Sequence, residues 1–266
     1  MKANKVDFST GLRMAAKSVT AFVLLFSLLK SAHAQETLNE LTVDRPGIAE
    51  APFTVSPGMF QLETGFEYYN RAKGEVFFLP VSLFRTGLSK NAELRITARN
   101  TIDRQQLPAV RGLAPLTVGV KTHIIEQRKW IPETDILVDL ILPLGKQSDL
   151  QPPELGHDVL LLFQNDLSNK WALNYNVGLI WDGFSNQSLF TASFCVNFLP
   201  TDRVGLFAEY YDFVRAKTAE HGIDMGLTYL ILPMLQADLS AGISRLEGKL
   251  NYFLASGISV RINAIN

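Results

Sequence analysis

In several extended segments of this chain, charged side chains of both signs occupy alternate positions, here called one parity of the segment. The set comprises Glu63, Glu67, Arg85, Glu93, Arg95, Arg99 and Glu209. Successive side chains of an extended chain point to opposite faces, so these groups would share one face of a sheet. Acids and bases gathered on one face can form a selective constriction for a solute. They can equally satisfy one another as a salt-bridge network that fills a narrow interior, because an unpaired buried charge is costly. The sequence leaves both interpretations open.

A second charged group precedes the first extended segment. Asp44, Arg45 and Pro46 lie in the stretch 35–57, which is rich in proline and polar residues and shows no sustained period. One hypothesis is that this periplasmic lead-in folds into the mouth of a pore, where the Asp–Arg pair meets charges of the wall and narrows the opening. The alternative is a purely structural lead-in that orders the first strand.

Catalytic chemistry has little support in the sequence. The histidines after residue 34 are His123, His157 and His221, and no GxSxG, HExxH or CxxC motif and no phosphate-binding glycine loop accompanies them. The single cysteine, Cys195, excludes an intramolecular disulfide. We therefore expect no enzyme, no cofactor and no metal, with a lipid-modifying barrel enzyme as the least favoured alternative.

The elements that would position the charged residues are predicted to be strands. In KWALNYNVGLIWDGF, residues 170–184, apolar residues with tryptophan at both ends alternate with mostly polar or small ones. About twelve strand-like segments follow residue 58, separated by turn-like clusters, and no long helical period appears. Trp171, Tyr175 and Trp181 would contribute to an aromatic girdle at the two membrane interfaces.

These segments predict an all-β fold, a closed antiparallel transmembrane β-barrel over residues 58–266. A sheet that spans hydrocarbon must close on itself, because an unpaired backbone group there costs several kcal/mol. The apolar parity would face lipid and the charged parity a wet lumen. A secreted soluble β-sandwich or lipocalin-like barrel alternates in the same way and is the alternative fold.

The first residues predict export. A basic start, the apolar run VTAFVLLFSLL and an Ala-x-Ala site indicate a signal peptide over residues 1–34, with cleavage after Ala34. The chain beyond it carries 20 basic and 25 acidic residues, which gives no electrostatic reason to bind nucleic acid. A hydrophobic content of 47% without a second apolar run of helical-span length favours the cell outer membrane, with membrane lipid as a partner.

Several motifs carry a resemblance to a known family. Residues 43–68, VDRPGIAEAPFTVSPGMFQLETGFEY, resemble the opening of a bacterial outer-membrane transporter family described by the MetA-pathway of phenol degradation. Further similar stretches are RTGLSKNAELR (85–95), LTVGVK (116–121), LPLG (142–145), YNVG (175–178) and FAEYY (207–211). Val43 stands where the family usually has threonine, and the chain ends SVRINAIN without the usual terminal aromatic residue.

The resemblance implies an outer-membrane barrel channel that lets small solutes, hydrophobic or aromatic ones among them, enter by passive diffusion. It also implies the barrel-assembly machinery as a partner during biogenesis, and the missing aromatic terminus would weaken that recognition. A non-transporting barrel with a structural or partner-binding role is the alternative function.

Overall fold

The computed structural model describes residues 41–105, 107–145 and 148–263, and every regular element among them is a β-strand. The predicted signal peptide and the last three residues lie outside this part of the chain. No helix of the described residues is long and apolar enough to cross a membrane. The strands are β1 (Met59–Arg71), β2 (Gly74–Ser89), β3 (Ala92–Asp103), β4 (Val110–Leu113), β5 (Leu116–Ile125), β6 (Glu133–Leu142), β7 (Gly156–Ser168), β8 (Trp171–Trp181), β9 (Leu189–Thr201), β10 (Val204–Arg215), β11 (Thr218–Leu232), β12 (Leu235–Leu246) and β13 (Lys249–Asn263).

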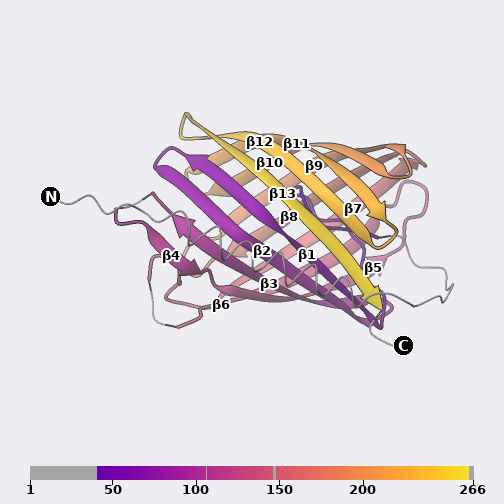
Figure 1. The fold of residues 1–266 in the computed structure, drawn as a ribbon, viewed down its shortest axis with the longest axis horizontal. Coiled ribbons are helices and arrows are strands. Elements are labelled where there is room, and N and C mark those ends of the chain that lie inside the picture. Colours follow the sequence, from indigo (N-terminus) through magenta and orange to yellow (C-terminus); the bar gives the residue numbers. More distant parts are fainter. Residues whose placement is uncertain (1–40, 106, 146–147, 264–266) are drawn as a thin grey trace. The chain divides into compact units, whose positions relative to one another are not determined.

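Twelve of these strands close into a barrel (Figure 1). Each strand pairs antiparallel with its neighbours along the chain, and the first and last strands, β1 and β13, pair with each other to complete the ring. The prediction of an all-β, closed antiparallel barrel of roughly twelve strands is therefore confirmed. Closure leaves no long edge whose N–H and C=O groups would need water.

The thirteenth strand, β4, corrects one detail of the sequence-based assignment. The stretch 101–112 reads as a connecting loop, but β3 continues to Asp103 and its last residues pair with β4. The earlier residues of β3, from Ala92 to Thr97, pair with β5 instead. The strands β4 and β5 therefore pair one after the other along the same edge of β3. Pro115 separates them, because proline has no N–H to give to a ladder.

The two faces of the sheet carry opposite chemistry. Large apolar side chains point outward, such as Met225 with 64% of its surface exposed, whereas Glu63 and Lys121 point inward and are fully buried. In β8, Trp171 and Trp181 lie at opposite ends of the outer face, while Asn174 and Asn176 face the lumen with 6% exposed each. A polar interior inside an apolar exterior is the reverse of a soluble barrel and suits a wall between lipid and water.

The candidate girdle residues are held by aromatic stacking on the outer face. The Trp171 ring stacks on Phe198 with centroids 4.4 Å apart, and the Trp181 ring stacks on His157 at 4.6 Å. Tyr175 lies between them, and its hydroxyl donates to Asn165 at 3.0 Å. Their contribution to anchoring in a bilayer stays a prediction.

The connections orient the barrel. At the end where β1 begins and β13 ends, most turns are two residues long, as at 90–91, 169–170, 202–203 and 233–234. The opposite end carries the longer connections 143–155 and 182–188. Outer-membrane barrels have short periplasmic turns and longer extracellular loops. We therefore call the end that holds Met59 and Asn263 the periplasmic end and the other the outer end.

The lipid-facing assignment predicts a depth-dependent cost for a charge on β11. Arginine in place of Met225, at the centre of the strand, should destabilise the barrel by about 2–4 kcal/mol, whereas Leu232→Arg beside the periplasmic turn should cost about 1 kcal/mol or less. Urea unfolding from lipid vesicles, followed by the gel mobility difference between unheated and heated protein, measures both. An equal loss at the two positions would contradict the membrane-spanning orientation of β11.

Candidate functional site

The chain segment before the first strand runs through the interior of the barrel. We call residues 41–58 the lumenal segment. Its Thr42 carbonyl accepts a hydrogen bond from Gln61 on β1 at 2.8 Å. Arg45 then reaches Glu67 on β1 at 3.1 Å and Asp238 on β12 at 3.5 Å. The first few residues of the segment are thus bound to two strands, β1 and β12.

The middle of the lumenal segment crosses to the far wall. The N–H groups of Ile48 and Ala49 donate to the Glu209 carboxylate on β10 at 2.8 and 2.6 Å. The Glu50 N–H donates to the side-chain oxygen of Asn176 on β8 at 2.7 Å, and its carbonyl accepts from the same side chain at 3.1 Å. These contacts span the lumen from β1 to β8 and obstruct it.

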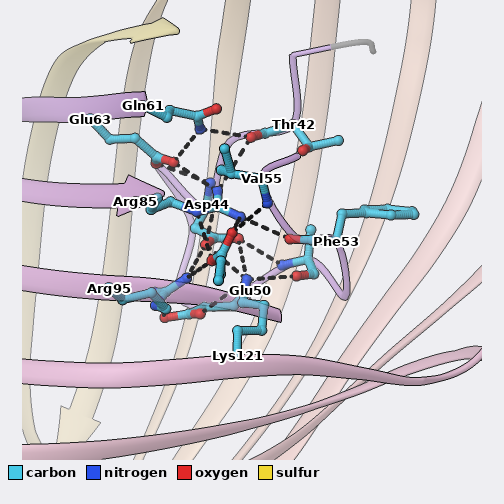
Figure 2. Close-up of polar contacts among 12 residues, drawn as sticks. Thr42, Asp44, Glu50, Phe53, Val55, Gln61, Glu63, Arg85, Arg95 and Lys121 are labelled. Carbon is cyan, nitrogen blue, oxygen red and sulfur yellow. Dashed lines mark hydrogen bonds and ion pairs between the residues drawn. The ribbon is translucent and has the colours of Figure 1, made fainter. Parts of the chain in front are cut away.

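Three cations of the wall converge on one carboxylate of the segment (Figure 2). Asp44 accepts two hydrogen bonds from the Lys121 ammonium at 2.9 and 3.0 Å. Its second oxygen also contacts the guanidinium groups of Arg85, at 3.1 Å, and Arg95. Asp44 has 8% of its surface exposed, and the Lys121 and Arg85 side chains have none. The pairs are therefore desolvated, and each ion depends on its partners.

Two wall carboxylates complete this cluster. Glu63 accepts the backbone N–H groups of Asp44 and Arg45 at 3.0 and 3.1 Å and an Arg85 N–H at 2.9 Å. Glu93 accepts two further Arg85 N–H groups at 2.9 and 3.0 Å and the N–H of Val55 at 2.6 Å. The same wall groups that pair with one another therefore also hold the backbone of the lumenal segment.

The later residues of the segment, from Glu50 to Phe53, also bind the wall cations of the cluster. Lys121 donates to the Ala51 carbonyl at 2.9 Å, and Arg95 donates to Glu50 at 2.8 Å. The Phe53 carbonyl accepts from Arg85 at 2.8 Å. Figure 2 shows these groups pointing toward one another from the segment and from the adjacent strands.

The surroundings of Asp44 keep it ionised. Burial disfavours the charged carboxylate, but the positive charges of Arg85, Lys121 and Arg95 outweigh that cost and lower the pKa of Asp44 below its ordinary value of 3.8. A lowered pKa contributes stability that is present above the ordinary value and is lost only as the pH falls through the lowered one. Mild acidification to about pH 4 should therefore leave this anchor intact.

Most of the candidate lumen residues meet in or around the lumenal segment. Glu63, Arg85, Glu93 and Arg95 form the cluster with Asp44, whereas Glu67 and Glu209 bind the segment farther along. Arg99 faces the same lumen from β3 but has no hydrogen bond to the segment among the described residues. Of the trio before the first strand, Asp44 and Arg45 carry ion pairs, and the Pro46 carbonyl accepts from Ser240 at 3.4 Å. Whether these groups sort solutes stays a prediction.

Sequence reasoning missed several partners of this site. Glu50 gave no signal, because a residue in an aperiodic stretch has no predictable partner across a barrel. The alternation of residues 170–184 gives Asn176 a lumen-facing position but does not show that it binds Glu50. The alternation of LTVGVK gives Lys121 a lumen-facing position, but only the fold brings it beside Asp44.

The lumen widens above the lumenal segment into a cavity of about 430 Å³ at the outer end of the barrel. We call it the outer vestibule. Four inward-facing residues, Tyr69, Tyr211, Phe213 and Phe253, form its aromatic wall. The outward-facing Tyr252 borders the cavity, and Ile48 of the lumenal segment also lines it. The Tyr69 and Phe253 rings lie 5.4 Å apart and those of Tyr211 and Phe213 5.5 Å apart. Part of the signal for this site was available, since Tyr69 alternates in step with Glu67, and Tyr211 and Phe213 alternate in step with Glu209.

The remaining chemistry-bearing residues do not assemble a further centre. His123 lies against Asp135, with Nδ1 2.9 Å from the carboxylate, near the periplasmic end of β5 and β6. Within the described ranges, no group of three or more His, Cys, Asp or Glu side chains is arranged to hold a metal ion.

Residues 43–262 match the model of the family described as "Putative MetA-pathway of phenol degradation". The chain belongs to this family. No curated protein sequence matches it. Among solved structures it is similar to an outer membrane channel from Pseudomonas putida F1, with a TM-score of 0.61 and 14% identity over 82% of this chain and 99% of that one.

Two porins share the fold at lower identity. The NanC porin matches with a TM-score of 0.53 and 9% identity over 76% of this chain and 100% of that one. The KdgM porin matches with 0.52 and 6% over 74% and 98%. At such identities these likenesses show a common fold, that of outer-membrane barrels, which supports an outer-membrane location for this family member.

The ion cluster predicts that Asp44 controls how firmly the lumenal segment is seated. Asp44→Asn leaves three buried cations without their shared anion, and breaking a buried pair costs about 3–5 kcal/mol. The segment should then leave its seat, so that the ion conductance of the full-length protein in planar bilayers rises and proteases reach the segment.

The matched control is Glu75→Gln, which removes an ion pair with Arg104 in which both side chains are well exposed. It should change neither the conductance nor the protease pattern, because exposed pairs contribute little. Asp44→Asn protein with the conductance and protease resistance of the unchanged chain would show that the seat does not depend on this cluster.

Proposed function

We propose that the protein is an outer-membrane channel through which small aromatic compounds enter by passive diffusion, with the outer vestibule as their first binding site. The observation that carries this proposal is the aromatic wall of the vestibule. Four inward-facing aromatic side chains line one cavity at the outer end of a lumen that is otherwise dominated by charges and amides. A barrel that only needed filling would have no reason to concentrate aromatic residues there.

The size and composition of the vestibule suit a single-ring solute. Ligand sites are commonly clefts of about 300–1,000 Å³ with an apolar, aromatic lining and a few polar groups. Aromatic pairs favour offset or edge-to-face contacts with centroids about 4.5–7 Å apart, and each is worth about 0.5–1.5 kcal/mol beyond area burial. Tyr211 and Phe253 are 4% and 5% exposed, so their rings form a fixed surface. Family membership and the barrel fold support the same function.

The lumenal segment would act as the barrier below this binding site. It is held by hydrogen bonds and ion pairs to β1, β3, β5, β8 and β10, and Ile48 at its tip touches the vestibule. When a solute displaces the segment, the polar groups that hold it can form hydrogen bonds with water instead. A segment held by apolar contacts would have to expose apolar surface to water.

Uptake by intact cells tests the proposal. Gram-negative cells that make the protein should take up labelled benzamide, a small neutral aromatic amide, faster than cells with an empty vector. Phe213→Ala removes one ring from the vestibule and should raise the half-saturating concentration about threefold to tenfold, as expected for one aromatic contact.

The control removes a ring from the opposite face of the barrel. Phe190 on β9 points outward with 41% of its surface exposed, so Phe190→Ala should leave uptake unchanged. Both variants are compared at equal amounts of heat-shifting barrel. Uptake no faster than in the vector control would refute the channel function, and equal effects of the two variants would refute the vestibule as its binding site.

A further inference from the structure

Two arginines line the outer vestibule beside its aromatic wall. Arg71 at the end of β1 lies over the Tyr69 ring, 5.4 Å from its centroid, and forms no ion pair with a carboxylate of the described chain. Arg215 at the end of β10 donates to Asp182 at 2.6 Å, and its buried Nε has no hydrogen-bond partner among the described residues. Both guanidinium groups therefore keep donors that can turn to a ligand.

The vestibule itself supplies little negative charge. Its one acidic lining residue is Glu220, which accepts hydrogen bonds from Ser244 at 2.5 Å and Asn251 at 3.4 Å and makes no ion pair with Arg71 among the described residues. The hairpins that border the cavity add the exposed lysines Lys73, Lys217 and Lys249. The acids on these turns are Glu247, which is exposed, and Glu75, whose carboxylate is already paired with Arg104. The approach to the vestibule is thus positively charged, which favours the entry of anions.

From this juxtaposition we infer that the vestibule prefers small aromatic anions, arene carboxylates above all, to neutral aromatic compounds of the same size. The inference rests on the proposed function and specifies its solute class. A ring packs against Tyr69, Tyr211, Phe213 and Phe253, while a carboxylate on its edge accepts the N–H groups of Arg71. The planar guanidinium matches a carboxylate with two parallel hydrogen bonds, and stacking on Tyr69 holds it ready.

The neutral counterpart of such a ligand uses only half of the site. An amide or alcohol can pack on the same rings, but it offers Arg71 a weaker, uncharged acceptor. A carboxylate carries the opposite charge and accepts two parallel N–H groups of the guanidinium, whereas a neutral amide offers one carbonyl oxygen. Benzoate and benzamide have nearly the same shape, so the difference between their affinities isolates the contribution of charge.

Calorimetric titration of the full-length protein in nanodiscs of zwitterionic lipid tests this inference. At neutral pH and low salt, sodium benzoate should bind about tenfold more tightly than benzamide. Arg71→Gln should reduce the affinity for benzoate to that for benzamide and leave benzamide binding unchanged. Lys73→Gln, two residues away on the same hairpin but outside the cavity lining, should shift benzoate affinity less than twofold.

A second variant guards against a folding defect. Arg71→Lys keeps the positive charge and should retain the preference for benzoate, provided that it shows the same heat-dependent gel shift. Equal affinities for benzoate and benzamide, or an unchanged preference in Arg71→Gln, would overturn the inference. If the inference fails in this way but benzamide uptake still depends on Phe213, the channel function stands. If the protein neither takes up nor binds these compounds, the channel function and the inference both fail.

Discussion

The pairing of β1 with β13 is the constraint on which the rest of the structure depends. These two strands lie at opposite ends of the sequence and run in register from Met59 opposite Asn263 to Asn70 opposite Tyr252. In hydrocarbon every backbone N–H and C=O must be paired within the protein, so the sheet is stable only when this seam is closed. Closure then divides the side chains into an outer apolar surface and an enclosed polar one.

That enclosure creates an electrostatic problem that the lumenal segment helps to solve. The wall alone brings Arg85, Arg95 and Lys121 close together, and these cations would repel one another because their side chains are almost fully buried. Asp44 supplies the missing negative charge, and Glu63 and Glu93 accept both wall cations and segment amides. Barrel and segment are therefore complementary parts of one buried network, since removal of either leaves unpaired ions.

Much of the barrel could be predicted from alternation alone. The stretch from Trp171 to Trp181 shows both faces of the wall in its residue types, and the parity of Glu63, Glu93 and Glu209 places them in the lumen as the structure does. The strand count follows because most of the membrane-spanning strands alternate and are bounded by turn-like clusters. The pairing of β4 with β3 could not be predicted, because four residues are too few to show a period.

The path of the lumenal segment was also beyond prediction, for a related reason. Its contacts join residues far apart in sequence, such as Ile48 with Glu209 and Glu50 with Asn176, and an aperiodic stretch gives no register to extrapolate. The position of an arginine in the fold, more than its residue type, decides whether it pairs with carboxylates of the protein or remains available to a solute. Arg85 on the periplasmic side is saturated by Asp44, Glu63 and Glu93 and serves the seat of the segment.

Arg71 on the outer side is the same residue type in the opposite situation. It lies over an aromatic ring without a carboxylate partner in the described chain and remains available to a solute. The lumen thus holds an inner zone, where the lumenal segment satisfies the Asp44 cluster and Glu209, and an outer zone, where aromatic faces lie beside a guanidinium without a carboxylate partner in the described chain. Because Ile48 touches the outer zone while its N–H binds Glu209 in the inner one, a solute in the vestibule meets the segment at the residue that anchors its tip.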